Sequence, residues 1–324
     1  MKLTLLSAAE FRRALPMPEA VELMKEAYAE YSAGAVLAPQ RLALDIPTDG
    51  ITLVKPAYLE SGGLGAKIVS VFPGNRELGR PVTSGLMVIL DPATGEPLGL
   101  ADGGFVTAWR TGAASGAATD LLARPDARVG AIFGCGAQAR TQALALDAVR
   151  SFDEIRVYAR TAADVARFVE DMSADVRARL VPASTPLEAV EGADVICAAT
   201  TASRPVFDGT SLADGAHVNG IGSFTLEMQE VDEETVGRAR VFVDSHRSAT
   251  AEAGDLMIAA RKGRTDPTSW VELGEVVAGR EPGRQSAGEL TFFKSVGLAV
   301  QDVKACAVAM ARARELGWGR QVEI

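Results

Sequence analysis

Histidine, cysteine and long apolar runs are scarce in this sequence, and each scarcity excludes a class of protein. The 324 residues include 2 histidines and 3 cysteines. With so few histidines we expect no histidine-based metal site or catalytic triad, and we predict no bound metal. Cys135, Cys197 and Cys306 show neither disulfide nor metal-ligand spacing. Cysteines without disulfide spacing are usual in proteins of a reducing compartment, so we expect a cytoplasmic protein.

No basic stripe and no membrane segment are evident either. The net charge is -9, with acidic and basic residues mixed along the chain, so a nucleic-acid partner is not expected. Residues 1–17 begin apolar but soon become charged, which argues against a signal peptide or a membrane span. A hydrophobic fraction of 48% is ordinary for a globular protein, and the length favours two domains. A small anionic substrate would then need a locally basic pocket.

The first third of the chain is predicted to be one helical segment followed by strands. Residues 1–34 are predicted to be helical, with Ser7 and Glu10 as a capping box and Gly34 as the terminator. Four short apolar or alternating runs then predict strands, a turn is expected at 91–95, and a helix at about 106–122. The four predicted strands are 41–46, 51–59, 64–72 and 85–91.

After residue 126, strands and helices alternate. Such alternation predicts a parallel sheet covered on both faces. A long helix is predicted from 294 to 316. The expected strands are 129–134, 154–160, 193–200, 217–223 and 240–245, and the expected helices between them include 137–150 and 161–172.

The segment Gly134-x-Gly136-x-x-Ala139 follows the first of these strands and opens the next helix. In that context it matches the dinucleotide-binding fingerprint of a Rossmann domain. Gly134 would make the tight turn, Gly136 would let the backbone approach a pyrophosphate, and the helix N-terminus would favour the anion. The alternative is a tight strand–helix turn without a ligand.

The end of the second strand bears on cofactor choice. NAD-selective sites carry an acidic residue there, whereas this sequence has Arg160 and Thr161. Arginine can pair with a 2′-phosphate and threonine can donate a hydrogen bond to it. We therefore predict NADPH as the cofactor, with NADH possible. The alternative is that Arg160 is an ordinary exposed side chain.

Several ordered motifs together resemble the ornithine cyclodeaminase/mu-crystallin family, nearly from end to end. The resemblance implies an α/β fold: a doubly wound Rossmann domain at 119–291 and a smaller α+β substrate and dimerisation domain at 1–118 plus 292–324, to which the last helix returns. It also implies a homodimer. The motifs are Gly65–Val69, Phe72–Asn75, Leu100–Gly104, Trp109–Ser115, Gly134–Ala139, Glu252–Leu256 and Phe293–Gly297.

The resemblance also implies site residues. Arg41, Lys67 and Arg110 match basic residues that line the substrate pocket. Cofactor contacts are implied at or near Thr83, Arg110, Thr111, Ala137, Gln138, Thr200, Gly222 and Ser295. Arginine binds a carboxylate through two parallel hydrogen bonds (bidentate binding), which suits the carboxylate of a small imino or amino acid.

Lys67 is the catalytic candidate. It interrupts the apolar run at 64–72, where a lysine is usually a solvent-facing strand position. With the resemblance, we assign it to the carboxylate and to the proton source. A pocket cation also stabilises developing charge. Lys55 stands where relatives usually have methionine, and its role is left open.

The resemblance leads to a functional hypothesis. Cyclodeaminases of the family carry an aspartate where this chain has Phe224, which argues against cyclodeamination. Glu227 and Glu230 lie nearby, but glutamates at a helix start are more often solvated. Asp302, His217 and His246 are assigned no role. We predict NADPH-dependent reduction of a cyclic ketimine carboxylate, 1-pyrroline-2-carboxylate to proline or 1-piperideine-2-carboxylate to pipecolate. The alternatives are an ornithine cyclodeaminase, an alanine-type dehydrogenase, or a ligand-binding protein without catalysis.

Overall fold

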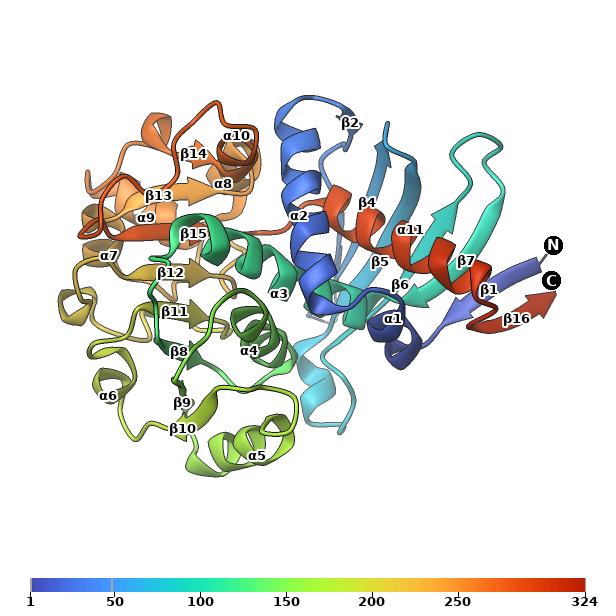
Figure 1. Ribbon diagram of the computed structural model, residues 1–324. Helices are drawn as coiled ribbons and strands as arrows, with labels where there is room; N and C mark the ends of the chain where they lie inside the picture. Colours follow the sequence, from blue (N-terminus) through green and yellow to red (C-terminus); the bar gives the residue numbers. More distant parts are fainter. Residues whose placement is uncertain (1, 48, 324) are drawn as a thin grey trace. The chain divides into compact units, whose positions relative to one another are not determined.

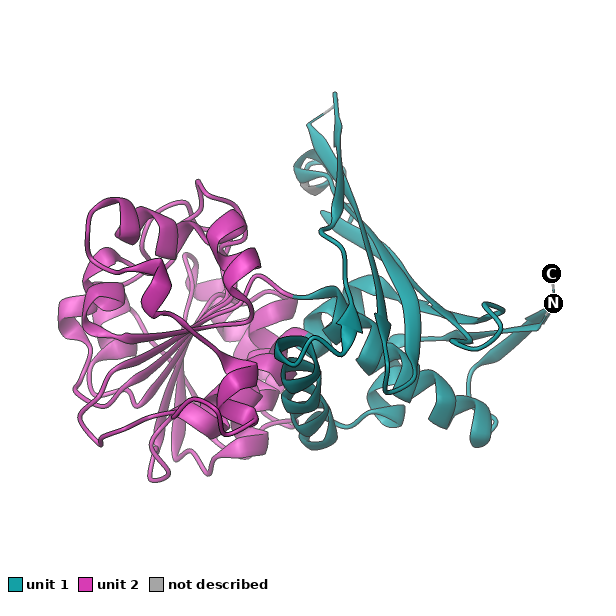
Figure 2. Ribbon diagram, turned by 90° about the horizontal axis from the view of Figure 1, so that it is seen from above, with its two compact units in different colours: residues 1–110, 298–324 teal, residues 111–297 magenta. Residues whose placement is uncertain are grey.

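The computed structural model describes residues 2–47 and 49–323, and the chain divides into two compact units (Figures 1 and 2). The first unit comprises Met1–Arg110 and Leu298–Ile324, and the second comprises Thr111–Gly297. These boundaries lie six to eight residues from the domain boundaries expected from the sequence. The division falls inside α3 (Gly103–Leu122).

The first unit is built on a mixed sheet. Its strand order is β16-β1-β7-β6-β5-β4-β2, with β3 also paired to β4. The β1–β7 pair is parallel, and the other pairs are antiparallel. The strands are β1 (Lys2–Leu6), β2 (Val36–Leu37), β3 (Leu42–Ile46), β4 (Gly50–Leu59), β5 (Gly63–Val71), β6 (Thr83–Leu90), β7 (Pro97–Asp102) and β16 (Arg320–Glu323).

Helices cover one face of this sheet. The C-terminal helix α11 (Ala299–Glu315) packs on β4, β5 and β6 and on the two N-terminal helices, α1 (Ala8–Ala14) and α2 (Met17–Ser32). Its return to the N-terminal elements confirms what the family resemblance implied. Along β4 and β5, buried residues alternate with more exposed ones, as expected for strands with one covered face.

The prediction for residues 1–34 is wrong at its start. Residues 2–6 form β1, a largely buried strand between β7 and β16, because pairing with two strands outweighs the local helical signal. The Ser7–Glu10 capping box is present at α1, and Gly34 has a φ of 74° just after α2. The predicted helix at 294–316 is also wrong at its start: residues 291–294 form a strand, and α11 begins at Ala299.

The second unit is a doubly wound α/β domain, which confirms the predicted fold class. Its eight strands are all parallel, in the order β10-β9-β8-β11-β12-β15-β13-β14. The strands are β8 (Val129–Phe133), β9 (Glu154–Tyr158), β10 (Arg179–Pro182), β11 (Val195–Ala198), β12 (His217–Gly220), β13 (Arg240–Val243), β14 (Val271–Glu272) and β15 (Thr291–Lys294). Beside α3, the helices are α4 (Ala137–Val149), α5 (Ala162–Met172), α6 (Pro186–Val190), α7 (Glu233–Arg238), α8 (His246–Glu252), α9 (Gly254–Arg261) and α10 (Leu273–Val277).

The strand order places the ligand site. From β8 the chain runs outward through β9 and β10, then returns to the other side of β8 as β11. Ligands of open α/β sheets bind at such a switch point, beyond the carboxyl ends of the strands. Both faces of the sheet are apolar: Ile132 and Phe133 of β8, one residue apart, belong to separate buried clusters.

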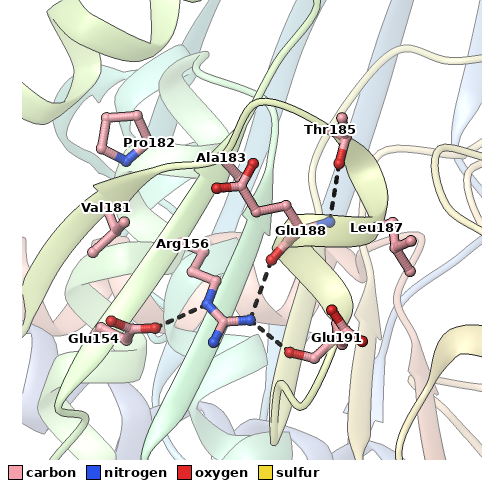
Figure 3. A pocket seen from close by; sticks show the side chains of 9 residues that line it. All are labelled: Glu154, Arg156, Val181, Pro182, Ala183, Thr185, Leu187, Glu188 and Glu191. Carbon is pink, nitrogen blue, oxygen red and sulfur yellow. Dashed lines mark hydrogen bonds and ion pairs between the residues drawn. The ribbon is translucent and has the colours of Figure 1, made fainter.

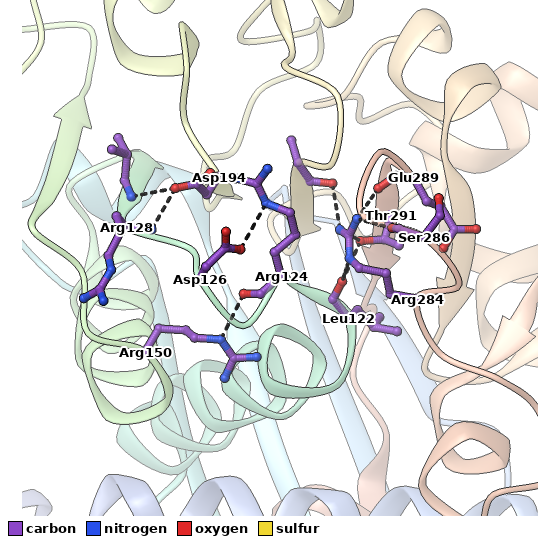
Figure 4. Close-up of polar contacts among 12 residues, drawn as sticks. Leu122, Arg124, Asp126, Arg128, Arg150, Asp194, Arg284, Ser286, Glu289 and Thr291 are labelled. Atoms are coloured by element: carbon purple, nitrogen blue, oxygen red, sulfur yellow. Dashed lines mark hydrogen bonds and ion pairs between the residues drawn. The ribbon is translucent and has the colours of Figure 1, made fainter.

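At the amino ends of these strands, polar contacts close the opposite edge of the sheet (Figure 4). The Arg284 guanidinium donates to the backbone oxygen of Leu122 at 2.6 Å and to the Thr291 hydroxyl at 3.0 Å. Asp194 accepts hydrogen bonds from Arg124 and from the backbone N–H groups of Arg128 and Val129. This edge is therefore occupied by protein groups, which leaves the carboxyl edge for a ligand.

Within the described residues, no helix is long and apolar enough to cross a bilayer.

Candidate functional site

Three charged side chains meet inside the first unit. Lys67 Nζ lies 2.8 Å from Asp302 Oδ2, and Arg110 Nε lies 2.9 Å from Asp302 Oδ1. All three side chains are almost completely buried. The structure thus joins two of the three predicted substrate-binding cations through an acid to which the sequence analysis assigned no role.

Secondary structure fixes each member of this cluster. Lys67 occupies an inner position of β5, and its ammonium group also donates to the Thr107 hydroxyl at 2.8 Å. Arg110 lies on α3, and Asp302 lies in the first turn of α11. The neighbouring Gln301 accepts a hydrogen bond from Arg110 Nη1 at 3.1 Å. The guanidinium group is therefore held on two sides before any ligand arrives.

Burial governs the proton affinities in the cluster. Burial lowers the pKa of Lys67 to about 7, because the attraction of Asp302 only partly offsets it and the charges of Arg110 and Lys55 act in the same direction as burial. Burial alone would raise the pKa of Asp302, but the neighbouring cations hold it at about 2. Asp302 is therefore ionised at neutral pH, while Lys67 can exchange a proton there.

Arg41 lies next to the same sheet as Lys67, outside the Lys67–Asp302–Arg110 cluster. It immediately precedes β3, where Leu42 pairs with Val54 of β4. The next position along β4 is Lys55, which pairs with Lys67 of β5. By register, Arg41 is thus two strands from Lys67, and it is half-buried. Arg41, Lys55 and Lys67 thus follow one row across the sheet, whereas Arg110 reaches Asp302 from α3.

The fingerprint loop of the second unit has the backbone geometry that the sequence predicted. Gly134 has a φ of 107°, and a Cβ there would lie 2.6 Å from the Ala199 oxygen, so only glycine fits. Around a Cβ placed on Gly136, no described atom lies within 4 Å. The backbone is thus open to a ligand where a pyrophosphate would approach.

Helix α4 adds a second feature to this loop. Its N-cap is Gly136, which supplies no side-chain hydrogen bond to the N–H groups of the first turn. Gln138 Oε1 is also buried without a hydrogen-bond partner among the described residues. Free N–H groups at the start of a helix favour an anion. The residues present therefore fit a dinucleotide.

The end of β9 carries Arg160 and Thr161, both exposed. Thr161 is the N-cap of α5: its hydroxyl donates to Asp164 Oδ2 at 2.6 Å and accepts from the Asp164 N–H. The hydroxyl hydrogen of Thr161 is thus already used within the protein. Of this pair, Arg160 is the residue with donors to offer a phosphate.

A buried glutamate connects two loops at the carboxyl edge of the sheet. Glu230 Oε1 accepts from the Thr200 N–H, after β11, and Oε2 accepts from Gly222 and Ser223, after β12, at 2.5 to 3.0 Å. A Cβ on Gly222 would lie 1.9 Å from the Thr200 oxygen, so the loops meet closely. The sequence analysis left Glu230 open. Its neighbour Glu227 is exposed.

Glu230 is itself held by a buried ion pair. Asp255 Oδ1 accepts from the N–H groups of Glu230 and Val231, and its Oδ2 lies 2.7 Å from Lys294 Nζ. Burial raises the pKa of Glu230, although Lys294 opposes the shift. We call Glu230, Asp255 and Lys294 the loop clamp.

The loop after β15 has a similar support. Asp244 Oδ2, just after β13, accepts from the Ser295 hydroxyl at 3.2 Å and from the N–H groups of Val296 and Gly297 at 2.8 and 2.6 Å. Ser295, Thr200 and Gly222 therefore follow three neighbouring strands of one sheet edge. Thr111 is buried in the second unit, and Thr83 is exposed at the start of β6 in the first unit.

One surface cavity of about 470 Å³ lies among β9, β10 and α6 (Figure 3). The guanidinium group of Arg156, which lies in this cavity, is already hydrogen-bonded within the protein. It donates to Glu154 at 2.9 Å and to the backbone oxygen of Glu191 at 2.6 Å. None of the predicted site residues lines this cavity. Within the described residues, no group of acids, histidines and cysteines has the arrangement of a metal site.

This chain is similar in sequence and in fold to known proteins. A family model described as the ornithine cyclodeaminase/mu-crystallin family matches residues 1–316. A Delta(1)-pyrroline-2-carboxylate reductase of Bacillus cereus is 37% identical over 322 residues, covering 98% of this chain and 99% of the relative. The solved structure of the Thermococcus litoralis Delta(1)-pyrroline-2-carboxylate reductase, in complex with NADH and L-proline, is 37% identical with a TM-score of 0.95, covering 99% of this chain and 100% of that one. An archaeal alanine dehydrogenase dimer with bound NAD is 31% identical with a TM-score of 0.92, covering all of both chains.

Proposed function

This chain belongs to the ornithine cyclodeaminase/mu-crystallin family, and from that membership we propose that it is an NAD(P)H-dependent reductase of cyclic ketimine carboxylates. The first substrate to test is 1-pyrroline-2-carboxylate, which would give proline, and the second is 1-piperideine-2-carboxylate, which would give pipecolate. The observation that carries the proposal is the buried Lys67–Asp302–Arg110 cluster. It offers an anion site and an exchangeable proton together, as this reaction requires.

The cluster keeps donors in reserve for a substrate. Lysine has three N–H donors, and the two contacts described above, to Thr107 and Asp302, use two of them. Arginine has five donors, and the contacts to Asp302 and Gln301 use two. We assign the substrate carboxylate to Arg110, with Arg41 in support. We assign the proton for the imine nitrogen to Lys67.

The dinucleotide is assigned to the second unit. Gly134, Gly136, Ala137 and Gln138 would hold the pyrophosphate, and the loops after β11, β12 and β15 would hold the nicotinamide half through Thr200, Gly222 and Ser295. When bound, NAD(P)H supplies a hydride to the carbon of the C=N bond. We propose a preference for NADPH because Arg160 follows β9 in place of an acid.

Initial rates test the function directly. The purified protein is mixed with NADPH or NADH and each of the two imines, and cofactor oxidation is followed together with the amino acid formed. We expect turnover with at least one imine. Absence of turnover with both would refute the proposal. Conversion of L-ornithine to proline with release of ammonia would instead favour a cyclodeaminase, which Phe224 argues against.

We also propose a homodimer that works in a reducing compartment such as the cytoplasm. The archaeal alanine dehydrogenase relative is a dimer. The face of the first unit's sheet that points away from Lys67 carries a row of exposed apolar residues. Such a row on a single chain is typical of a surface that another protein molecule covers. Leu42, Ile68 and Leu86 of this row are each 44 to 58% exposed. All three cysteines are free, which supports the proposed compartment.

A further inference from the structure

Two lysines stand side by side on the inner face of the first unit's sheet. Lys55 of β4 and Lys67 of β5 are direct partners in an antiparallel pair, so their side chains leave the same face. Residues directly opposite one another have Cβ atoms about 5 Å apart. Both side chains are buried, with 7% and 2% exposed. Like charges at this spacing destabilise a sheet, so the pair calls for a functional explanation.

The surroundings of Lys67 show what a second lysine changes. From α11, Asp302 lies 2.8 Å away; from α3, Arg110 shares that carboxylate and Thr107 accepts a hydrogen bond. The facing residue on β6 is the apolar Met87. A carboxylate this close would normally hold a lysine in its charged form. Arg110 and Lys55 are the two cations that oppose it.

We propose that Lys55 is a positioning residue that makes the Lys67 ammonium group a proton donor, by placing a second positive charge beside it on the next strand. This inference rests on the proposed function. Burial and the charge of Arg110 also favour loss of the Lys67 proton, and Lys55 adds to both. Lysines next to another cationic group are a known route to a lysine that gives up its proton near neutral pH.

The proton balance of the step is simple. One N–H bond of the Lys67 ammonium group breaks, and one N–H bond forms on the imine nitrogen as the carbon is reduced. Lys67 is left neutral and takes a proton back from water. A donor works best when its pKa is close to the working pH. The pKa of Lys67, lowered by burial to about 7, is consistent with this role.

The test compares Lys55→Met with Lys55→Arg. Methionine has a similar length and no charge, so Asp302 should hold the Lys67 proton more firmly. The fall of kcat/KM on the basic side of the pH profile should then move upward by about one to two pH units. Arginine keeps the charge, and its profile should follow the unmodified protein. An upward shift in Lys55→Arg as large as that in Lys55→Met would overturn the proposal.

A second measurement does not need the reaction. In protein labelled with ¹³C at the lysine ε-carbon, the Lys67 signal is assigned by its loss in Lys67→Arg, and its titration is followed without substrate. We expect a higher midpoint in Lys55→Met and an unchanged one in Lys55→Arg. An unchanged Lys67 midpoint in folded Lys55→Met refutes this inference, whereas unmodified protein that reduces neither imine refutes the proposed function.

Discussion

At the scale of single residues, the proposed reaction depends on a lysine, Lys67, that can lose its charge near neutral pH. Asp302 favours the ammonium form of Lys67, and burial disfavours it more strongly, so the pKa falls to about 7. A donor of this kind is active when protonated. The rate constant kcat/KM should therefore fall as the pH rises through that value. An arginine at the same place would keep the charge and lose the exchangeable proton.

The variant Lys67→Arg tests this distinction. Because arginine stays protonated at all accessible pH values, kcat should fall by about 10² to 10⁴ while the KM for the imine changes much less. The decline of kcat/KM above neutral pH should also disappear. Steady-state rates across the neutral range measure both effects. The exposed Lys262→Arg is the control, and a Lys67→Arg protein with nearly normal kcat would contradict the assigned proton transfer.

Arg160 allows a second prediction at this scale. A charge-assisted hydrogen bond from arginine to phosphate contributes about 1.5 to 3 kcal/mol. Arg160→Ala should therefore lower kcat/KM with NADPH by roughly 10- to 100-fold and leave NADH almost unaffected. Arg167→Ala, an exposed arginine of α5, is the matched control. Equal losses with both cofactors would show that Arg160 does not read the 2′-phosphate.

At the scale of elements, the loop clamp decides how well the carboxyl edge of the second unit's sheet is organised. In Glu230→Gln, the new NH₂ group would face the N–H groups of Gly222 and Ser223 or of Thr200. Each N–H left without an acceptor costs about 1 to 3 kcal/mol. We expect a lower melting temperature and an NADPH dissociation constant raised at least about tenfold, which corresponds to about 1.4 kcal/mol.

Cofactor fluorescence titration and thermal denaturation measure the two effects separately. Glu227→Gln is the matched control, since it changes an exposed glutamate on the same segment. If Glu230→Gln is destabilised but binds NADPH normally, the loop clamp only supports the fold. If both quantities change, it also shapes the cofactor site.

The elements that could be predicted are those whose signal is local. The fingerprint loop and the Ser7 capping box depend on residues a few positions apart, and the sequence contains them. The strand β15 was not predicted, and a helix was expected to begin at Lys294 instead. A charged residue directly after Phe292 and Phe293 does not indicate a buried strand. Its partner Asp255 comes from another part of the chain. Pairing with β12 and β13 decides that segment.

The same limit applies to the site. Lys67 was predicted because it interrupts an apolar run and because of the family resemblance. Asp302 was not, because its contact with Arg110 spans 192 positions and nothing near it in the sequence points to a partner. The role of Glu230 was left open for a similar reason. Its carboxylate oxygens accept hydrogen bonds from backbone N–H groups that are 7 to 30 positions away.

At the scale of the whole molecule, charge is distributed unevenly between surface and interior. The chain carries a net charge of -9, yet Lys55, Lys67 and Arg110 are buried in the first unit. An acidic surface maintains solubility, while a local group of buried cations selects an anionic ligand. The acidic composition therefore does not conflict with a carboxylate substrate.

The proposed dimer follows from the other face of the same sheet. Leu42, Val54, Ile68 and Leu86 form one row across β3, β4, β5 and β6, on the side away from α11. Exposed apolar rows on a flat sheet are rarely left in water. A second copy of this chain would cover the row with an identical one, as in other isologous interfaces.

We expect the unmodified protein to have twice the 33.9 kDa mass of one chain by light scattering after size exclusion. Leu86→Glu places a charge in the middle of the row, where burial against a second copy would cost several kcal/mol, so this variant should be monomeric. Leu187→Glu is the control, because Leu187 is similarly exposed, 54% against 52%, but lies on α6 of the second unit. A Leu86→Glu dimer would show that copies meet elsewhere. A monomeric unmodified protein would leave the apolar row in need of a different partner and would refute the homodimer.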